Sequence, residues 1–217
     1  MSARPAIPGI VHVVDDDKAF RTAMGRLLTA AGYQPRLYAC ALDYLSADDS
    51  ASPACVLLDL RMPGASGLDV QHALAARENS HPVIFLSGHG DIPSTVHAMR
   101  SGALDFLTKP VKTATLLEAV TRALRRDAER AAELAHVSEL TGRYGSLTPR
   151  ERQVMAGVIE GKLNKQICFI LHAAERTVKT HRSRVMEKMK VRSVAELVRI
   201  AEELVSSGIA LVRLPEE

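Results

Sequence analysis

Short apolar runs alternate with amphipathic stretches over the first 112 residues of the chain. Five of these runs have the length of β-strands. They cover residues 10–14, 36–38, 55–58, 83–86 and 103–107. The stretches between them, such as 18–31 and 67–76, carry apolar residues at the three- and four-residue spacing of helices. This alternation predicts an α/β doubly wound fold, a five-stranded parallel sheet with helices on both faces. In such sheets functional groups collect beyond the carboxyl ends of the strands.

From residue 113 to about residue 143 the pattern is helical without interruption. Asp127 interrupts the apolar seam of this stretch, which argues against a free coiled coil. We therefore expect a linker helix over 113–146 that continues the last helix of the first domain. Pairing of this helix with a second copy stays open as an alternative.

A second domain begins just after the linker. Thr148 suits the cap of a helix, Pro149 its first turn, and Glu151 completes a capping box. Three further helices are predicted over 164–171, 175–189 and 193–204. We expect a first domain over 8–125 and an all-α, four-helix domain over 147–210.

Composition places the chain among globular proteins of two domains, with 217 residues, 47% hydrophobic and 24% charged. The apolar segments fall short of the roughly 18 to 20 residues that cross a bilayer. Pro5 and Pro8 interrupt the stretch where a secretion signal would be apolar. The three cysteines are widely spaced, which favours neither a disulfide framework nor a metal site. We expect a cytoplasmic protein with no membrane partner.

Acidic, hydroxyl and basic side chains follow the predicted strands. Asp15, Asp16 and Asp17 follow the first strand, Asp59 closes the third, Ser87 the fourth, and Lys109 follows the fifth. These groups would meet in one crevice, where close carboxylates repel one another unless a cation joins them. Mg²⁺ suits oxygen ligands and leaves positions for phosphate oxygens. The combination favours phosphoryl transfer to an aspartate.

Two other interpretations of the acids are open. Asp17 by itself is better explained as a cap of the first helix, because acids are favoured at helix N-termini. A phosphotransferase of the haloacid-dehalogenase type would use Asp15 as nucleophile and Asp17 as acid. Its motif needs Thr or Val at the position of Ala19, and it leaves the second domain unexplained. An enzyme would turn over many phosphate esters, whereas a phosphoacceptor would be labelled about once per chain.

The segments at the strand ends resemble the receiver domain of bacterial two-component response regulators. They read Val-Asp-Asp at 14–16, Leu-Asp-Leu-Arg-Met-Pro-Gly at 58–64, Leu-Ser-Gly-His-Gly-Asp at 86–91 and Lys-Pro at 109–110. The resemblance implies a flavodoxin-like strand order of 2-1-3-4-5 and phosphorylation of Asp59 by a partner histidine kinase. It also implies a Mg²⁺ cofactor held by Asp16, Asp59 and the backbone carbonyl of Arg61, with Asp15 contributing through water.

The same resemblance gives roles to three further residues. Lys109 would pair with the phosphoryl group, Ser87 would hydrogen-bond to it, and Phe106 would rotate inward as the switch aromatic. The surface expected to respond, and to pair two receivers, lies around Val96, Met99, Arg100, Asp105 and Leu116.

The formal net charge of +3 hides a strong difference between regions. Residues 1–112 have a net charge of −1 and residues 113–147 a net charge of 0, whereas residues 148–217 have +4. Seven basic and two acidic residues lie within 175–192. With Val178 inward, the opposite face of this helix combines long cations with short hydroxyl side chains, which suits the major groove of DNA. A solvated basic face is the ordinary alternative.

A second resemblance favours the DNA interpretation. Residues 147–151 (Leu-Thr-Pro-Arg-Glu), 161–167 (Gly-Lys-Leu-Asn-Lys-Gln-Ile) and 177–182 (Thr-Val-Lys-Thr-His-Arg) resemble the LuxR-type helix-turn-helix. The two halves together resemble the FixJ/NarL class of response regulators, which are not enzymes. The resemblance implies that helix 175–189 enters the major groove and that the last helix pairs two copies. The expected DNA-binding residues are Asn164, Lys165, Arg176, Lys179, Thr180, Arg182, Ser183 and Arg184.

These resemblances predict a phosphorylation-dependent transcriptional regulator that dimerises, binds double-stranded promoter DNA and activates transcription. The chain departs from the family at 172–174, where His-Ala-Ala replaces the usual Ser cap of the reading helix. It departs again at Phe169 and Ile170, where polar residues are usual, and this apolar pair either contacts a protein such as RNA polymerase or belongs to the core. A second domain that binds protein instead of DNA is the remaining alternative.

Overall fold

The computed structural model describes residues 8–47, 53–64, 66–75, 81–88 and 92–214. Within them, five parallel strands form one sheet in the order β2-β1-β3-β4-β5. The strands are β1 (Ile10–Val14), β2 (Gln34–Tyr38), β3 (Ala54–Asp59), β4 (Val83–Ser87) and β5 (Asp105–Thr108). The predicted doubly wound sheet and its strand order are therefore confirmed.

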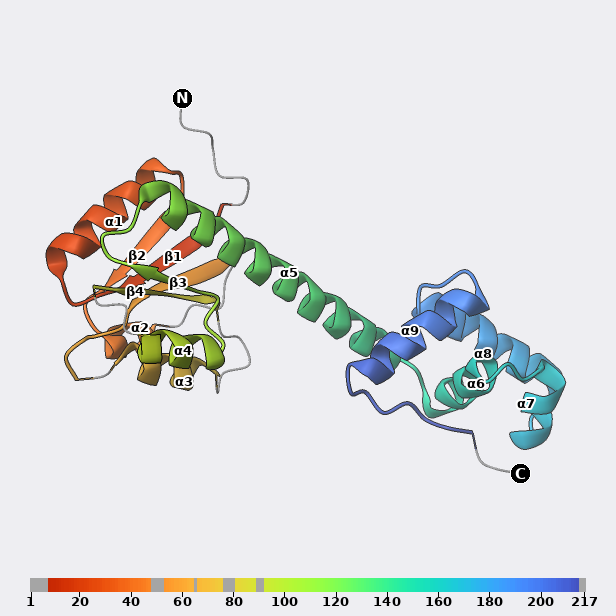
Figure 1. Ribbon diagram of the computed structural model, residues 1–217. Helices are drawn as coiled ribbons and strands as arrows, with labels where there is room; N and C mark the ends of the chain where they lie inside the picture. Colours follow the sequence, from red (N-terminus) through yellow and green to blue (C-terminus); the bar gives the residue numbers. More distant parts are fainter. Residues whose placement is uncertain (1–7, 48–52, 65, 76–80, 89–91, 215–217) are drawn as a thin grey trace. The chain divides into compact units, whose positions relative to one another are not determined.

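Helices cover both faces of this sheet (Figure 1). They are α1 (Lys18–Ala30), α2 (Ala41–Ser46), α3 (Gly67–Ala75), α4 (Ile92–Arg100) and the first part of α5 (Thr113–Gly145). Every residue of β1, β3 and β4 is buried, because α1 and α5 pack on one face and α2, α3 and α4 on the other. This double burial explains the continuous apolar runs in the sequence.

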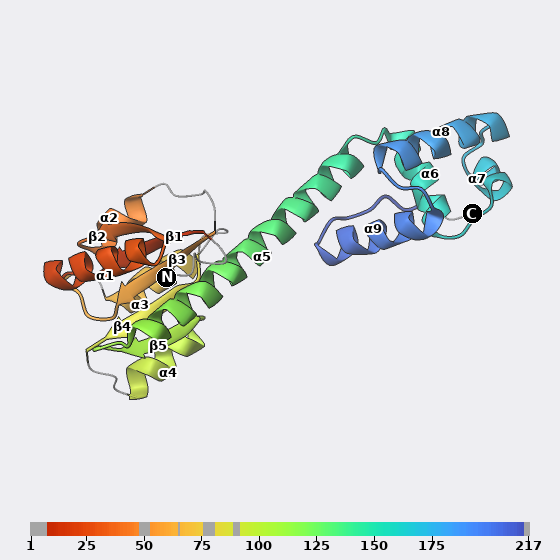
Figure 2. The same cartoon turned by 90° about the horizontal axis from the view of Figure 1, so that it is seen from above.

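The chain divides into two compact units, residues 1–131 and residues 132–217. The second unit, shown from above in Figure 2, contains the end of α5 and four shorter helices. These are α6 (Pro149–Ile159), α7 (Asn164–Ile170), α8 (Glu175–Lys188) and α9 (Val194–Ser206). Their apolar faces share one core with Leu140 and Tyr144 of α5. The predicted all-α domain of four helices is confirmed.

Local capping fixes several of these helices. Thr148 accepts from the Glu151 backbone N–H, and the Glu151 carboxylate accepts from the Thr148 backbone N–H, which makes the predicted capping box of α6. Ser193 caps α9. The N-cap of α8 is Ala174, whose side chain makes no capping hydrogen bond, as the sequence indicated.

The structure departs from the sequence interpretation in two places. Leu116, expected on the responsive surface, is fully buried and contacts the core between α5 and the sheet. The short helix α2 had no clear periodic signal of its own, because it has six residues and Cys40 precedes it without a side-chain cap.

No helix in the described ranges is both long and apolar enough to cross a membrane.

Candidate functional site

The carboxyl ends of four neighbouring strands bring the candidate phosphoacceptor residues together. Asp15 directly follows β1, Asp59 is the last residue of β3, and Lys109 directly follows β5. Ser87 ends β4, pairs with Thr108 of β5 and is buried. Because the strands are parallel and adjacent, residues up to 94 positions apart in sequence lie in one pocket.

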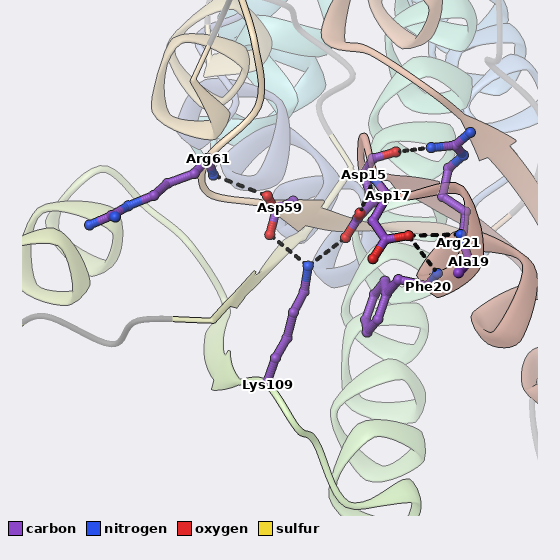
Figure 3. Close-up of polar contacts among 8 residues, drawn as sticks. All are labelled: Asp15, Asp17, Ala19, Phe20, Arg21, Asp59, Arg61 and Lys109. Carbon is purple, nitrogen blue, oxygen red and sulfur yellow. Dashed lines mark hydrogen bonds and ion pairs between the residues drawn. The ribbon is translucent and has the colours of Figure 1, made fainter.

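Lys109 lies between the two carboxylates of this pocket (Figure 3). Its Nζ atom donates to Asp15 Oδ2 at 2.6 Å and to Asp59 Oδ1 at 2.8 Å. The ammonium group also lies 4.1 Å from the centre of the Phe20 ring, a cation–π distance. Asp15 and Asp59 are both buried, so these charge-assisted bonds compensate for their lost hydration.

The electrostatics of the pocket favour a further positive group. Burial raises the pKa of Asp59, and the negative charge of Asp15 adds to this rise, although hydrogen bonds from Lys109 and the Arg61 N–H oppose it. Burial also disfavours the ammonium form of Lys109, but its hydrogen bonds to both carboxylates outweigh burial and raise the Lys109 pKa. Two buried acids thus share the ammonium group of one lysine, so a cation bound beside Asp59 would favour its ionised form.

The other acids next to β1 have different environments. Asp17 Oδ1 accepts from the backbone N–H groups of Ala19 and Phe20, so Asp17 caps α1, as predicted for this residue by itself. Asp16 is exposed. The Asp17 N–H in turn donates to Asp15 Oδ1 at 2.9 Å, which fixes the orientation of the buried carboxylate.

The donor atoms of the pocket are chemically suited to a hard divalent cation. Asp15, Asp16 and Asp59 offer carboxylate oxygens, and Arg61 offers its backbone carbonyl two residues after Asp59. Burial raises the pKa of Asp59, and a bound cation would act in the opposite direction. In the described part of the chain, however, no three His, Cys, Asp or Glu residues are already arranged to hold a metal ion.

Phe106, the residue predicted to be the switch aromatic, lies in the strand at the edge of the sheet, next to β4. Phe106 in β5 is half-buried, and its ring centre lies 6.3 Å from that of the fully buried Phe85.

Gly67 at the start of α3 packs so closely that a Cβ atom there would lie 2.5 Å from the Asp59 carbonyl oxygen and 2.8 Å from the Phe85 ring. Neither the sequence pattern nor the motifs indicated this close contact.

A separate basic surface lies on α8. Val178 and Val185 are buried on one face, as the helical periodicity predicted. Most of the predicted DNA-binding side chains on this helix are exposed: Arg176, Lys179, Thr180, Ser183 and Arg184. Lys179 forms an exposed ion pair with Glu175 at 2.9 Å. Lys165 at the start of α7 is exposed as well.

Arg182 and Asn164 differ from that exposed set. Both are half-buried, and Arg182 Nη1 donates to Asn164 Oδ1 at 2.9 Å. This hydrogen bond joins the first residue of α7 to the middle of α8. The sequence motif included both residues among the DNA-binding set but gave no sign that they contact each other.

The unusual apolar pair in α7 divides between surface and core. Phe169 is 72% exposed, whereas Ile170 packs against the core of the second unit. Leu163, just before α7, is also 70% exposed, although its apolar character alone does not indicate this.

The sheet with acids and a lysine at its strand ends, followed by a helical unit with a basic helix, defines a two-domain signalling regulator. A sequence profile described as "Response regulator receiver domain" matches residues 11–121, and one described as "Bacterial regulatory proteins, luxR family" matches residues 145–201. The chain belongs to the response regulators that join a receiver domain to a LuxR-type helix-turn-helix domain, the FixJ/TodT family.

Relatives match nearly the whole chain. "Response regulator protein TmoT" of Ectopseudomonas mendocina is 42% identical over 198 residues, covering 91% of this chain and 90% of that protein. "Transcriptional regulatory protein FixJ" of Bradyrhizobium diazoefficiens is 39% identical over 193 residues, covering 89% of this chain and 94% of that protein. The solved structure of the response regulator StyR has a TM-score of 0.85 at 41% identity, over 90% of this chain and 99% of that one. The protein is therefore a two-component response regulator and a transcriptional regulator, and its family is not one of enzymes.

Proposed function

We propose that Asp59 accepts a phosphoryl group from a histidine kinase and that this step switches a cytoplasmic, DNA-binding activator. The observation that carries the proposal is the position of Lys109, within 2.6 and 2.8 Å of the two buried carboxylates at adjacent strand ends. We assign the receiver to 8–125, the helical linker to 113–146 and the DNA-binding domain to 147–210.

In the proposed transfer, a carboxylate oxygen of Asp59 attacks the phosphorus atom of the kinase phosphohistidine. The bond between phosphorus and the imidazole nitrogen breaks, and an acyl phosphate forms on Asp59. Lys109 stabilises the negative charge of the phosphoryl oxygens, and the Ser87 hydroxyl donates to one of them. Asp16, Asp59 and the Arg61 carbonyl would hold Mg²⁺, with Asp15 contributing through water, and the bound cation would supply charge neutralisation for the transferring group.

The new charge then changes the hydrogen bonds of the pocket. Ser87 would move towards the phosphoryl group, and the half-buried Phe106 would turn inward into the space left behind. The exposed residues of α4 beside β5, Val96 and Met99, would respond and pair two receivers. Dimerisation on phosphorylation follows in this proposal.

Labelling with acetyl phosphate and Mg²⁺ tests the phosphoacceptor. We expect wild-type protein to take up about one phosphoryl group per chain, and Asp59→Asn to take up none. Asp17→Asn is the matched control, because Asn also caps helices well, and the Asp17 side chain accepts from backbone N–H groups at the start of α1. Unchanged labelling of a folded Asp59→Asn protein would refute the assignment.

The proposed DNA contact uses the exposed face of α8. Lys179, Arg176 and Arg184 present cations to phosphates and base edges, while Thr180 and Ser183 let the helix approach the groove. We expect affinity for duplex DNA to fall steeply between low and moderate salt, and to fall further in Lys179→Ala without a change in Asp59 labelling. Salt-independent binding would favour the protein-binding alternative.

Exposure of Phe169 supports a further protein contact during activation, with RNA polymerase as the expected partner. Phe169→Ala should lower transcription from a bound promoter and leave DNA affinity unchanged. Loss of DNA affinity in that variant would contradict the contact.

A further inference from the structure

Arg182 differs in burial and in partner from the exposed cations of α8, which are Arg176, Lys179 and Arg184. At about 100° per residue it lies only about 40° around the helix from the buried Val178, so it faces the side of the helix that packs. Its side chain is half-buried, whereas Arg184, two residues on, is exposed. Arg182 Nη1 donates to Asn164 Oδ1 across 18 residues of sequence.

This contact determines which end of the Asn164 amide is available. Arg has only donors, so the Asn atom facing it must be the carbonyl oxygen and the amide cannot be turned round. The two N–H groups of Asn164 Nδ2 are then directed elsewhere. A guanidinium bound to the carbonyl oxygen also polarises the amide and strengthens donation from its nitrogen. The natural partner for two N–H donors beside a basic helix is a phosphate oxygen of the DNA backbone.

We infer that Arg182 is a positioning residue, which acts on DNA by holding the Asn164 amide with its N–H groups towards a backbone phosphate, and does not itself contact the phosphate. The inference rests on the proposed DNA-binding function. It replaces one member of the expected contact set, since Arg182 no longer counts as a direct contact. The hydrogen bond between Arg182 and Asn164 also joins α8 to α7, and in this inference that bond contributes to DNA binding.

A double-mutant cycle on the full chain tests this role. The probe is a fluorescein-labelled duplex of about 30 base pairs, long enough for two half-sites one turn apart, with binding followed by anisotropy. We expect Asn164→Ala and Arg182→Met each to weaken binding about 10- to 150-fold, the effect of one hydrogen bond to a charged group. The double variant should bind no more than about twofold more weakly than either single variant. Losses that multiply in the double variant would overturn the inference.

Salt dependence gives a second measure, with Arg184→Met as the matched control. Loss of a phosphate-contacting cation lowers the magnitude of the slope of log affinity against log salt by about 0.9 for each chain bound. We expect Arg184→Met to show that decrease and Arg182→Met to keep the wild-type slope. A decreased slope in Arg182→Met would mean that its guanidinium contacts phosphate directly.

Two further comparisons separate positioning from folding. Arg182→Lys retains a donor that reaches Asn164 and should recover most of the lost affinity. Arg182→Met should lower stability to urea in either background of residue 164, yet weaken DNA binding only where Asn164 is present. If Arg182→Met weakened DNA binding equally in the Asn164→Ala background, Arg182 would be a merely structural residue.

Absence of salt-dependent binding in the wild type would refute the proposed function and the inference together, whereas salt-dependent binding with additive losses would refute the inference alone.

Discussion

The ion pair between Glu151 and Lys188 makes a sharp prediction about the stability of the DNA-binding unit. Glu151 is in the first turn of α6 and only 2% of it is exposed, and Lys188 Nζ at the end of α8 donates to its Oε2 at 2.7 Å. Lys188→Met keeps the aliphatic stem and removes the charge. Glu151 is then left as a buried anion to which the backbone N–H of Thr148 still donates.

The expected cost lies between the values for buried and exposed pairs. Breaking a buried pair costs about 3–5 kcal/mol, because it leaves an unpaired charge. Exposed pairs are worth about 0–1 kcal/mol. The Lys188 side chain is 34% exposed, and water screens part of the interaction. We therefore expect Lys188→Met to destabilise this unit by about 2–3 kcal/mol.

The effect depends on pH with a definite sign. Burial alone would raise the pKa of Glu151, but hydrogen bonds from Lys188 and from the Thr148 N–H hold it below its ordinary 4.5. A lowered pKa contributes stability that is complete above the unfolded value and is lost as the pH falls through the folded value. The difference in stability between wild type and Lys188→Met should therefore shrink as the pH falls below about 4.5.

Hydrogen exchange of the full chain, measured peptide by peptide, locates the loss in α6 and α8. A cost of 2–3 kcal/mol corresponds to about 30- to 150-fold faster exchange where amides open with this unit. Lys190→Met is the matched control, because Lys190 forms an exposed pair with Glu139 at 3.3 Å. Adding Glu151→Gln to Lys188→Met should recover stability, since Gln keeps the acceptor and removes the charge. Equal effects of Lys188→Met and Lys190→Met would refute the reasoning.

Three smaller perturbations have expected outcomes of their own. Asp127→Ala leaves the buried Ala54 N–H without the carboxylate that accepts from it at 2.9 Å, and should lower the free energy of unfolding of the receiver in urea by about 1–3 kcal/mol; an unchanged urea midpoint would contradict this. Gly67→Ala places a Cβ atom 2.5 Å from the Asp59 carbonyl oxygen, and should cost about 1–3 kcal/mol and slow acetyl phosphate labelling; wild-type labelling and stability would show that α3 adjusts freely. Ala174→Ser supplies the missing cap of α8 and should stabilise the DNA-binding unit by about 0.5–1 kcal/mol in thermal unfolding, with no gain if the serine makes no cap.

The sheet and its strand ends were predictable because their signals are local. Parallel strands buried on both faces appear as short apolar runs, and Asp59 and Lys109 lie at the ends of such runs. The capping box at Thr148 likewise depends on only four consecutive residues, 148–151. Each of these signals can be recognised without knowing what packs against the segment.

Contacts between distant segments were not predictable in the same way. In the sequence Asp127 only interrupts an apolar seam, yet its carboxylate accepts a hydrogen bond from the Ala54 N–H, 73 residues away. Arg182 belonged to a motif, and only its bond to Asn164 distinguishes it from exposed cations. Leu116 looked like a surface residue because its burial depends on how α5 packs against the sheet. Periodicity identifies a face that packs, but it does not name the partner.

The geometry of Lys109 also limits how much a phosphoryl group could change. Under the proposed function Lys109 must leave Asp15 or share its protons, so the gain is about that of one charge-assisted hydrogen bond, roughly 1.5–3 kcal/mol. That difference shifts a two-state equilibrium by about 10- to 150-fold, which takes an active state populated at about 1% to between about a tenth and about three fifths. A complete switch needs about 10⁴-fold. The rest must come from interactions made only by the active state, and pairing of two chains on DNA is the step that can supply them.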